Sequence, residues 1–131
     1  MRWIRNISIG LLLLGVALDC SAQQSSYDIR LKEAKGYALC ACLACMNRSV
    51  DSLSTINNDY SGSYFVQLSQ LTLDEMARIR KFVNRECMKF WGTPQDPKGN
   101  MIGYSVWKFY ESPELDRFIR QTIKPQKDEK Q

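Results

Sequence analysis

The fold of this chain is decided by the stretch Tyr37-Ala38-Leu39-Cys40-Ala41-Cys42-Leu43-Ala44-Cys45-Met46. No residue in it carries a charge, and most of its side chains are small. One helical stripe runs through it and beyond it at steps of four and three: Ala34, Ala38, Cys42, Cys45, Ser49, Leu53 and Ile56. Because a helix that is apolar all the way round is buried on all sides, we predict a buried central first helix over residues 28–56.

The residues that follow also favour helices, separated by turn and capping signals. A turn-rich segment at 57–63 precedes a short predicted helix over 64–70. Thr72-Leu73-Asp74-Glu75 is a capping box, in which Thr72 accepts from the Glu75 amide and the Glu75 side chain reaches back. This box begins a helix that extends to about residue 91 and ends before Gly92. Its apolar inner face is Met76, Ile79, Val83, Cys87 and Phe90.

Two more helices are predicted after a loop. Two prolines and a glycine make residues 93–100 the longest stretch without periodicity, and a helix over 101–110 follows. We place three of its aromatic residues in the core: Trp107, Phe109 and Tyr110. Ser112 and Pro113 are typical of the first positions of a last helix. Since no stretch alternates as a strand does, we predict an all-α fold, a compact bundle of about five helices.

The N-terminal residues predict export. Two arginines precede the apolar run 9–18 and small residues follow it, which is the pattern of a cleaved signal peptide over residues 1–22. The alternative is a retained membrane anchor, but the run is short against the roughly 20 apolar residues that a span needs. Lipidation at Cys20 fits less well, because Asp19 stands where lipoprotein processing takes a small residue. We expect no membrane attachment after cleavage.

Composition narrows the function. Lys and Arg number 18 against 14 Asp and Glu, and these charges are scattered, so we predict no nucleic-acid partner. The chain contains no histidine, the usual general base and the commonest metal ligand. We therefore predict neither an enzyme nor a cofactor. Residues 23–123 are long enough for one helical domain, and 124–131 read as a disordered charged tail.

The sequence allows three structural roles for the cysteines. Cys42, Cys45 and Cys87 lie on predicted inner faces, so Cys42–Cys87 or Cys45–Cys87 is the expected disulfide in an oxidising compartment. Closing a loop of about 40 residues would stabilise the fold by about 3–4 kcal/mol. Alternatively, the cysteines are small buried hydrophobes. A soft-metal site in Cys-x-Cys-x-x-Cys is less favoured, because converging thiolates need irregular backbone and this segment reads as helix.

Two blocks of the sequence resemble the type VI secretion system amidase immunity protein family. Tyr37–Leu43 is similar to its first-helix signature, and residues 106–116 are similar to its closing pattern of an aromatic, a polar residue and a serine followed by Glu-Leu-Asp. Family members carry a cysteine where this chain has Val106. The cysteine that bridges back to the first helix in the family is thus missing, and Cys87 is the candidate to replace it.

The resemblance implies a periplasmic inhibitor. Members bind a papain-like cysteine amidase effector, which cuts the peptide stems of peptidoglycan, and insert a surface loop into its active-site groove. They are typically homodimers. The alternative from another class is a periplasmic cysteine-based metal-binding protein or a small structural envelope protein.

Two segments are candidates for the contact with the toxin. The first is the inserted loop: Thr93, Pro94, Gln95, Asp96, Pro97, Lys98, Gly99 and Asn100. Its two prolines reduce the entropy lost on binding, although a plain connection between helices would have the same composition. The second segment contains Asp59 and Tyr60, because aromatic residues in a chain break often anchor partners.

Overall fold

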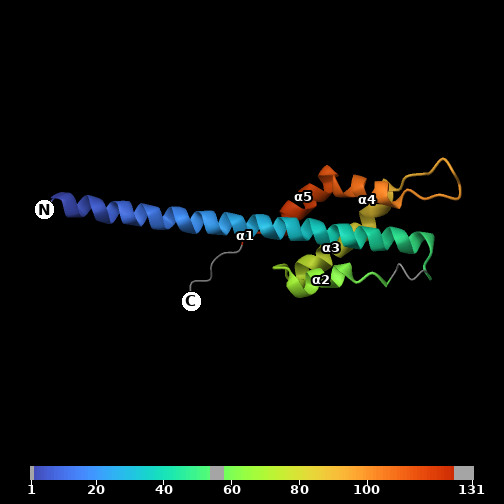
Figure 1. The fold of residues 1–131 in the computed structure, drawn as a ribbon, viewed down its shortest axis with the longest axis horizontal. Coiled ribbons are helices and arrows are strands. Elements are labelled where there is room, and N and C mark those ends of the chain that lie inside the picture. Colours follow the sequence, from blue (N-terminus) through green and yellow to red (C-terminus); the bar gives the residue numbers. More distant parts are fainter. Residues whose placement is uncertain (1, 54–57, 126–131) are drawn as a thin grey trace. The chain divides into compact units, whose positions relative to one another are not determined.

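The apolar stretch lies in helix α1 (Arg2–Val50) of the computed structural model, which describes residues 2–53 and 58–125 (Figure 1). Helix α1 begins before the predicted residue 28, because no proline or glycine interrupts residues 16–35. It ends earlier than predicted, where the Asp51 side chain accepts the Leu53 N–H in a turn. Leu53 is therefore 93 % exposed and not part of the inner stripe, and Ile56 lies outside the described residues.

The elements after α1 are α2 (Ser61–Leu68), α3 (Leu73–Glu86), the 3-10 helix η2 (Cys87–Phe90), α4 (Ile102–Tyr110) and α5 (Pro113–Thr122). The described residues form five α-helices and no strand, so the predicted all-α class is confirmed. The chain divides into two units, residues 1–29 with 124–131 and residues 30–123. The predicted tail falls largely outside the described residues, and none of the described helices has both the length and the apolar character needed to cross a membrane.

The start of α3 carries the predicted capping box. Thr72 Oγ1 accepts the Glu75 N–H at 3.2 Å, and the Thr72 N–H donates to Glu75 Oε2 at 2.8 Å. The other carboxylate oxygen, Oε1, accepts from Arg30 Nη2 at 2.5 Å, and these two side chains are only 4 % and 11 % exposed. One carboxylate therefore both begins α3 and fastens it to α1.

Aromatic rings form the core of the unit at residues 30–123. Phe82 stacks on Phe118 with ring centroids 4.0 Å apart, and Phe90 meets Phe109 edge-on at 5.5 Å. Four residues of the predicted inner face after Thr72 are buried, Met76, Ile79, Val83 and Cys87, whereas Phe90 is half-buried. Helix α5 buries Leu115, Ile119 and Thr122. The predicted Ser112 cap is confirmed as well, since its hydroxyl accepts the Leu115 N–H.

Helix α1 is not covered on every side, contrary to the prediction. Its buried residues in the central stretch form one stripe: Tyr37, Ala38, Cys42 and Met46. The residues between them are half-buried: Leu39, Cys40, Ala41, Leu43, Ala44 and Cys45. A few short helices enclose only part of a helical cylinder, so the small residues of the outer side remain partly accessible to solvent.

A glycine positions α2 against α1. A Cβ on Gly36 would lie 2.7 Å from Cζ of Phe65, so the aromatic ring occupies the space that a side chain would take. The same ring meets Tyr37 edge-on at 6.3 Å. Helix α2 has no fully buried residue, which makes this half-buried phenylalanine a principal contact of the helix.

The buried ion pair gives a first prediction. We expect Glu75→Gln to lower the free energy of unfolding by about 3–5 kcal/mol, because it removes the charge opposite the buried Arg30 guanidinium. Glutamine still serves in a capping box, so the start of α3 is retained. Urea unfolding at pH 7 measures the change. Asp74→Asn, at an exposed position in the same turn, is the matched control, and an equal loss in both variants would contradict the prediction.

Candidate functional site: a surface loop beside an exposed aromatic pair

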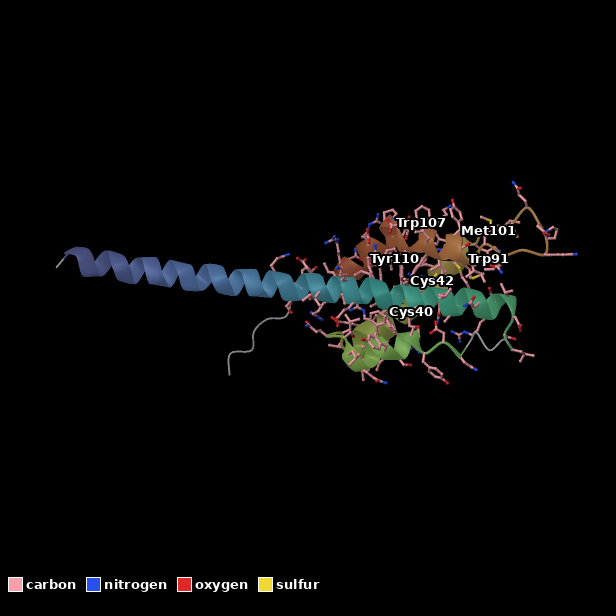
Figure 2. The ribbon with its side chains drawn as sticks, viewed as in Figure 1. Cys40, Cys42, Trp91, Met101, Trp107 and Tyr110 are labelled. Carbon is pink, nitrogen blue, oxygen red and sulfur yellow. The ribbon has the colours of Figure 1, made fainter. Side chains whose placement is uncertain are left out.

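The predicted toxin-binding loop joins η2 to α4 on the surface of the protein (Figure 1). All of its residues from Thr93 to Asn100 are exposed except Pro94, which is half-buried. Trp91 and Met101 are both half-buried and stand at the two ends of the loop (Figure 2). The loop therefore projects its polar residues into solvent from an apolar base.

Hydrogen bonds hold this loop at its tip and at its base. Asp96 Oδ1 accepts the Lys98 N–H at 2.9 Å, and the Asp96 carbonyl accepts the Gly99 N–H at 3.0 Å. At the base, the Gly92 N–H donates to Oγ of Ser105 at 2.9 Å, and Ser105 is fully buried in α4. A loop that is already ordered loses less entropy when it binds a partner.

An exposed aromatic pair lies in α4, shortly after the loop. Tyr104 is 49 % and Trp107 56 % exposed, and their ring centroids are 5.8 Å apart. The predicted core position of Trp107 is therefore wrong, whereas Phe109 is fully buried and Tyr110 half-buried. Trp107 lies two residues, about 200° of helical rotation, from the buried Phe109 and so faces away from the core. A helical wheel anchored on Phe109 is the signal that would have found it.

The second predicted segment precedes α2. Asp59 Oδ1 accepts from the Ser61 hydroxyl and from its N–H at 2.8 Å, and these bonds hold the pKa of Asp59 below its ordinary value. Tyr60 is exposed. Figure 1 shows α2 and the 93–100 loop on opposite sides of α1, so the two predicted segments do not form one surface.

Three cysteines come together where α1 meets the end of α3. Sγ of Cys87 lies 3.0 Å from Sγ of Cys45, within hydrogen-bonding distance. A hydrogen bond with Cys42 and burial raise the pKa of Cys87, and burial followed by the contact with Cys87 raises that of Cys45 to about 11. Cys40, Cys42, Cys45 and Cys87 are free thiols in the structure, so the disulfide stays a prediction. The 3.0 Å distance between the sulfur atoms of Cys45 and Cys87 is compatible with a bridge between these two residues.

The half-buried Cys40 lies apart from this cluster. It lines a pocket with Asp59, and burial followed by that carboxylate raises the pKa of its thiol. No group of three or more His, Cys, Asp or Glu side chains in the described part of the chain is arranged to hold a metal ion. Because their pKa values are raised, the thiols of Cys40, Cys45 and Cys87 stay protonated at neutral pH.

Comparison of the chain with protein-family models, curated proteins and solved structures found no match.

The thiol cluster predicts an oxidised form. We expect mild oxidation to join Cys87 to Cys45 or Cys42 and to raise the free energy of unfolding by about 3–4 kcal/mol, through closure of a long loop. Peptide mapping without reductant identifies the bridge, and denaturant unfolding measures the gain. Cys40→Ser should keep the whole gain, whereas Cys87→Ser should abolish it. A gain that survives in Cys87→Ser would show that the two helices are not bridged.

The raised pKa of Cys45 predicts a pH dependence of the reduced protein. Its thiol has an ordinary pKa of 9.0 and a pKa of about 11 in the folded chain, so the unfolded chain loses its proton first. Stability is therefore retained below pH 9 and falls as the pH rises through 11. Denaturant unfolding in reductant at a series of pH values measures this slope, and Cys45→Ser should make it shallower. Equal slopes in the two proteins would refute this assignment.

Proposed function

We propose that this chain is an exported immunity protein, which binds a papain-like cysteine peptidoglycan amidase and occludes its active site. The observation that carries the proposal is the ordered, exposed 93–100 loop with the exposed Tyr104–Trp107 pair next to it in the chain. The two sequence blocks that resemble the immunity family support it. They fall in the central part of α1 and across α4 and α5.

The loop has the physical properties that an occluding element needs. The Asp96 side chain accepts the Lys98 N–H and so forms a tight turn at the tip of the loop. The prolines at positions 94 and 97 restrict the backbone further. Little entropy is then lost when the loop enters a groove. The rings of Tyr104 and Trp107 supply rigid apolar area, and tryptophan and tyrosine are the residue types most often found at the energetic centre of an interface.

We further propose that the protein acts in the periplasm as a non-catalytic homodimer. The signal-like residues 1–22 support export, and the absence of histidine from the sequence supports inhibition by occlusion and not by chemistry. Two exposed apolar side chains of α2 that lie outside the groove linings are available to a second copy: Tyr64 and Leu68. Light scattering of the purified protein tests the dimer separately from toxin binding.

We expect an amidase gene adjacent to this one, and the decisive experiment uses its product. That amidase, directed to the periplasm of a test bacterium, should lyse the cells, and co-expression of this chain should prevent lysis. Purified proteins should bind in calorimetry, and the complex should no longer cleave peptidoglycan. Continued lysis together with absent binding would refute the proposal for that pair.

Substitutions in the loop and in the aromatic pair test the mode of binding. We expect Lys98→Glu to weaken amidase binding at least tenfold, and Trp107→Ala to cost about 2 kcal/mol or more, as truncation of a hot spot does. Lys98 takes part in the loop turn through its backbone N–H only, so its replacement leaves the turn intact. Lys32→Glu, at an exposed position on α1, is the charge-matched control. If Lys98→Glu and Trp107→Ala both bind and protect as well as the control does, neither the loop nor the aromatic pair is the contact.

A further inference from the structure

A groove with two chemically different halves is lined by α1, α2 and α3, and α1 supplies Cys40, Ala41, Ala44 and Arg48 to its polar half. Its polar half has a volume of about 310 Å³ and is lined by Arg48, Asp59 and Ser63 among others. Its apolar half has a volume of about 460 Å³ and is lined by Val66, Leu73, Met76 and Ala77. Three residues line both halves and so mark the junction: Tyr37, Arg80 and Asn84. Figure 1 shows α3 crossing behind α1, with its first turns next to α2.

The junction offers hydrogen-bond donors to an anion. Arg80 donates from Nε and Nη2 to the Tyr37 hydroxyl oxygen at 3.1 and 2.9 Å. The tyrosine oxygen is thus an acceptor in both bonds, and no described residue accepts the proton of its own O–H group. A guanidinium that withdraws charge from this oxygen makes the hydroxyl a better donor.

The charges around the polar half favour a ligand that carries a carboxylate. Arg48 and Arg80 supply two positive charges against the single carboxylate of Asp59. Asp59 still offers an acceptor oxygen, because Ser61 is bonded to Oδ1 only. The side-chain amide of Asn84 both donates and accepts, which is the pattern that a peptide group matches.

The apolar half lacks a partner for its own side chains. Val66 and Leu73 are exposed although they are aliphatic, and Ala77, also exposed, lines the same half. An apolar side chain of a ligand would remove their surfaces from water.

We propose that this groove binds the C-terminal residue of a peptide that ends in an apolar side chain. The terminal carboxylate accepts from the Tyr37 hydroxyl and pairs with Arg80, while the apolar side chain lies against Val66 and Leu73. The preceding peptide group bonds to Asn84, and a peptide N–H donates to Asp59. A fatty acid would match the carboxylate and the apolar half but would leave the Asn84 and Asp59 acceptors without donors. The groove is lined by α1, α2 and α3 and by no residue of the 93–100 loop, so it does not depend on the proposed role of that loop.

A titration of the full chain followed by NMR tests this assignment. The probes are N-acetyl-Gly-Leu with a free carboxylate, the same peptide as its C-terminal amide, N-acetyl-Gly-Ser, and decanoate. We expect the free acid to shift the Asn84 side-chain signal and to bind about tenfold or more tightly than the amide, since a charge-assisted bond is lost. The serine peptide should bind more weakly than the leucine peptide.

Matched variants locate the site. Arg80→Ala should weaken binding of the free acid to the level of the amide, while Arg78→Ala, exposed on the same helix but outside the groove lining, should not. Gly62→Ala is a second variant that keeps the fold, because its new Cβ would lie at an ordinary 3.8 Å from the Tyr37 ring. It should narrow the polar half and reduce affinity.

Several results would overturn the proposal. For the peptides, these are equal affinity for the acid and the amide, or no binding of either at millimolar concentration. For the variants, it is an equal effect of the Arg78 and Arg80 substitutions. For the lipid probe, it is tighter binding of decanoate than of the leucine peptide. The last result would indicate a lipid site. Because none of these measurements involves the amidase, failure here leaves the immunity proposal standing, and failure of that proposal leaves this one standing.

Discussion

The structure depends on one buried carboxylate. One oxygen of Glu75 accepts from Arg30 and the other accepts the Thr72 N–H. The same carboxylate therefore neutralises the buried guanidinium and satisfies a backbone N–H at the start of α3. Since removing either partner of a buried ion pair is costly, this contact sets the position of α3 along α1. Two further contacts follow in the same order, Tyr37 with Arg80 and Cys45 with Cys87. The two helices therefore run side by side in the same direction, and the thiol cluster and the groove both follow from that pairing.

Signals confined to a few residues predicted local structure well. The capping box at Thr72 and the Ser112-Pro113 start were found because their hydrogen bonds join residues three positions apart. The limits of α1 were not found, because residues 16–35 favour a helix continuously and nothing in them marks a start. The partial exposure of α1 was also missed. How far neighbouring helices cover a helix is a tertiary property, and uncharged residues alone do not report it.

The same division holds for the candidate site. Prolines and glycine located the 93–100 loop, and Asp96 supplies the turn that such compositions favour. The core prediction for Trp107 is wrong because burial in a short helix depends on the face on which a residue lies, and a large apolar side chain does not report that face. The pairs Arg30–Glu75 and Tyr37–Arg80 join residues more than 40 positions apart. A single sequence contains no local signal for such pairs.

The absence of a side chain at Gly36 couples the evolution of positions 36 and 65. A methyl group at position 36 would meet the Phe65 ring at 2.7 Å, well inside van der Waals contact, so the residue at 36 cannot grow unless the residue at 65 shrinks. If position 36 carried a side chain, Phe65 would hold α2 away from α1. If position 65 lost its ring while Gly36 remained, a void would be left beside Tyr37. Relatives of this protein should accordingly vary at these two sites in concert, and that covariation would be a record of helix packing left in the sequences themselves.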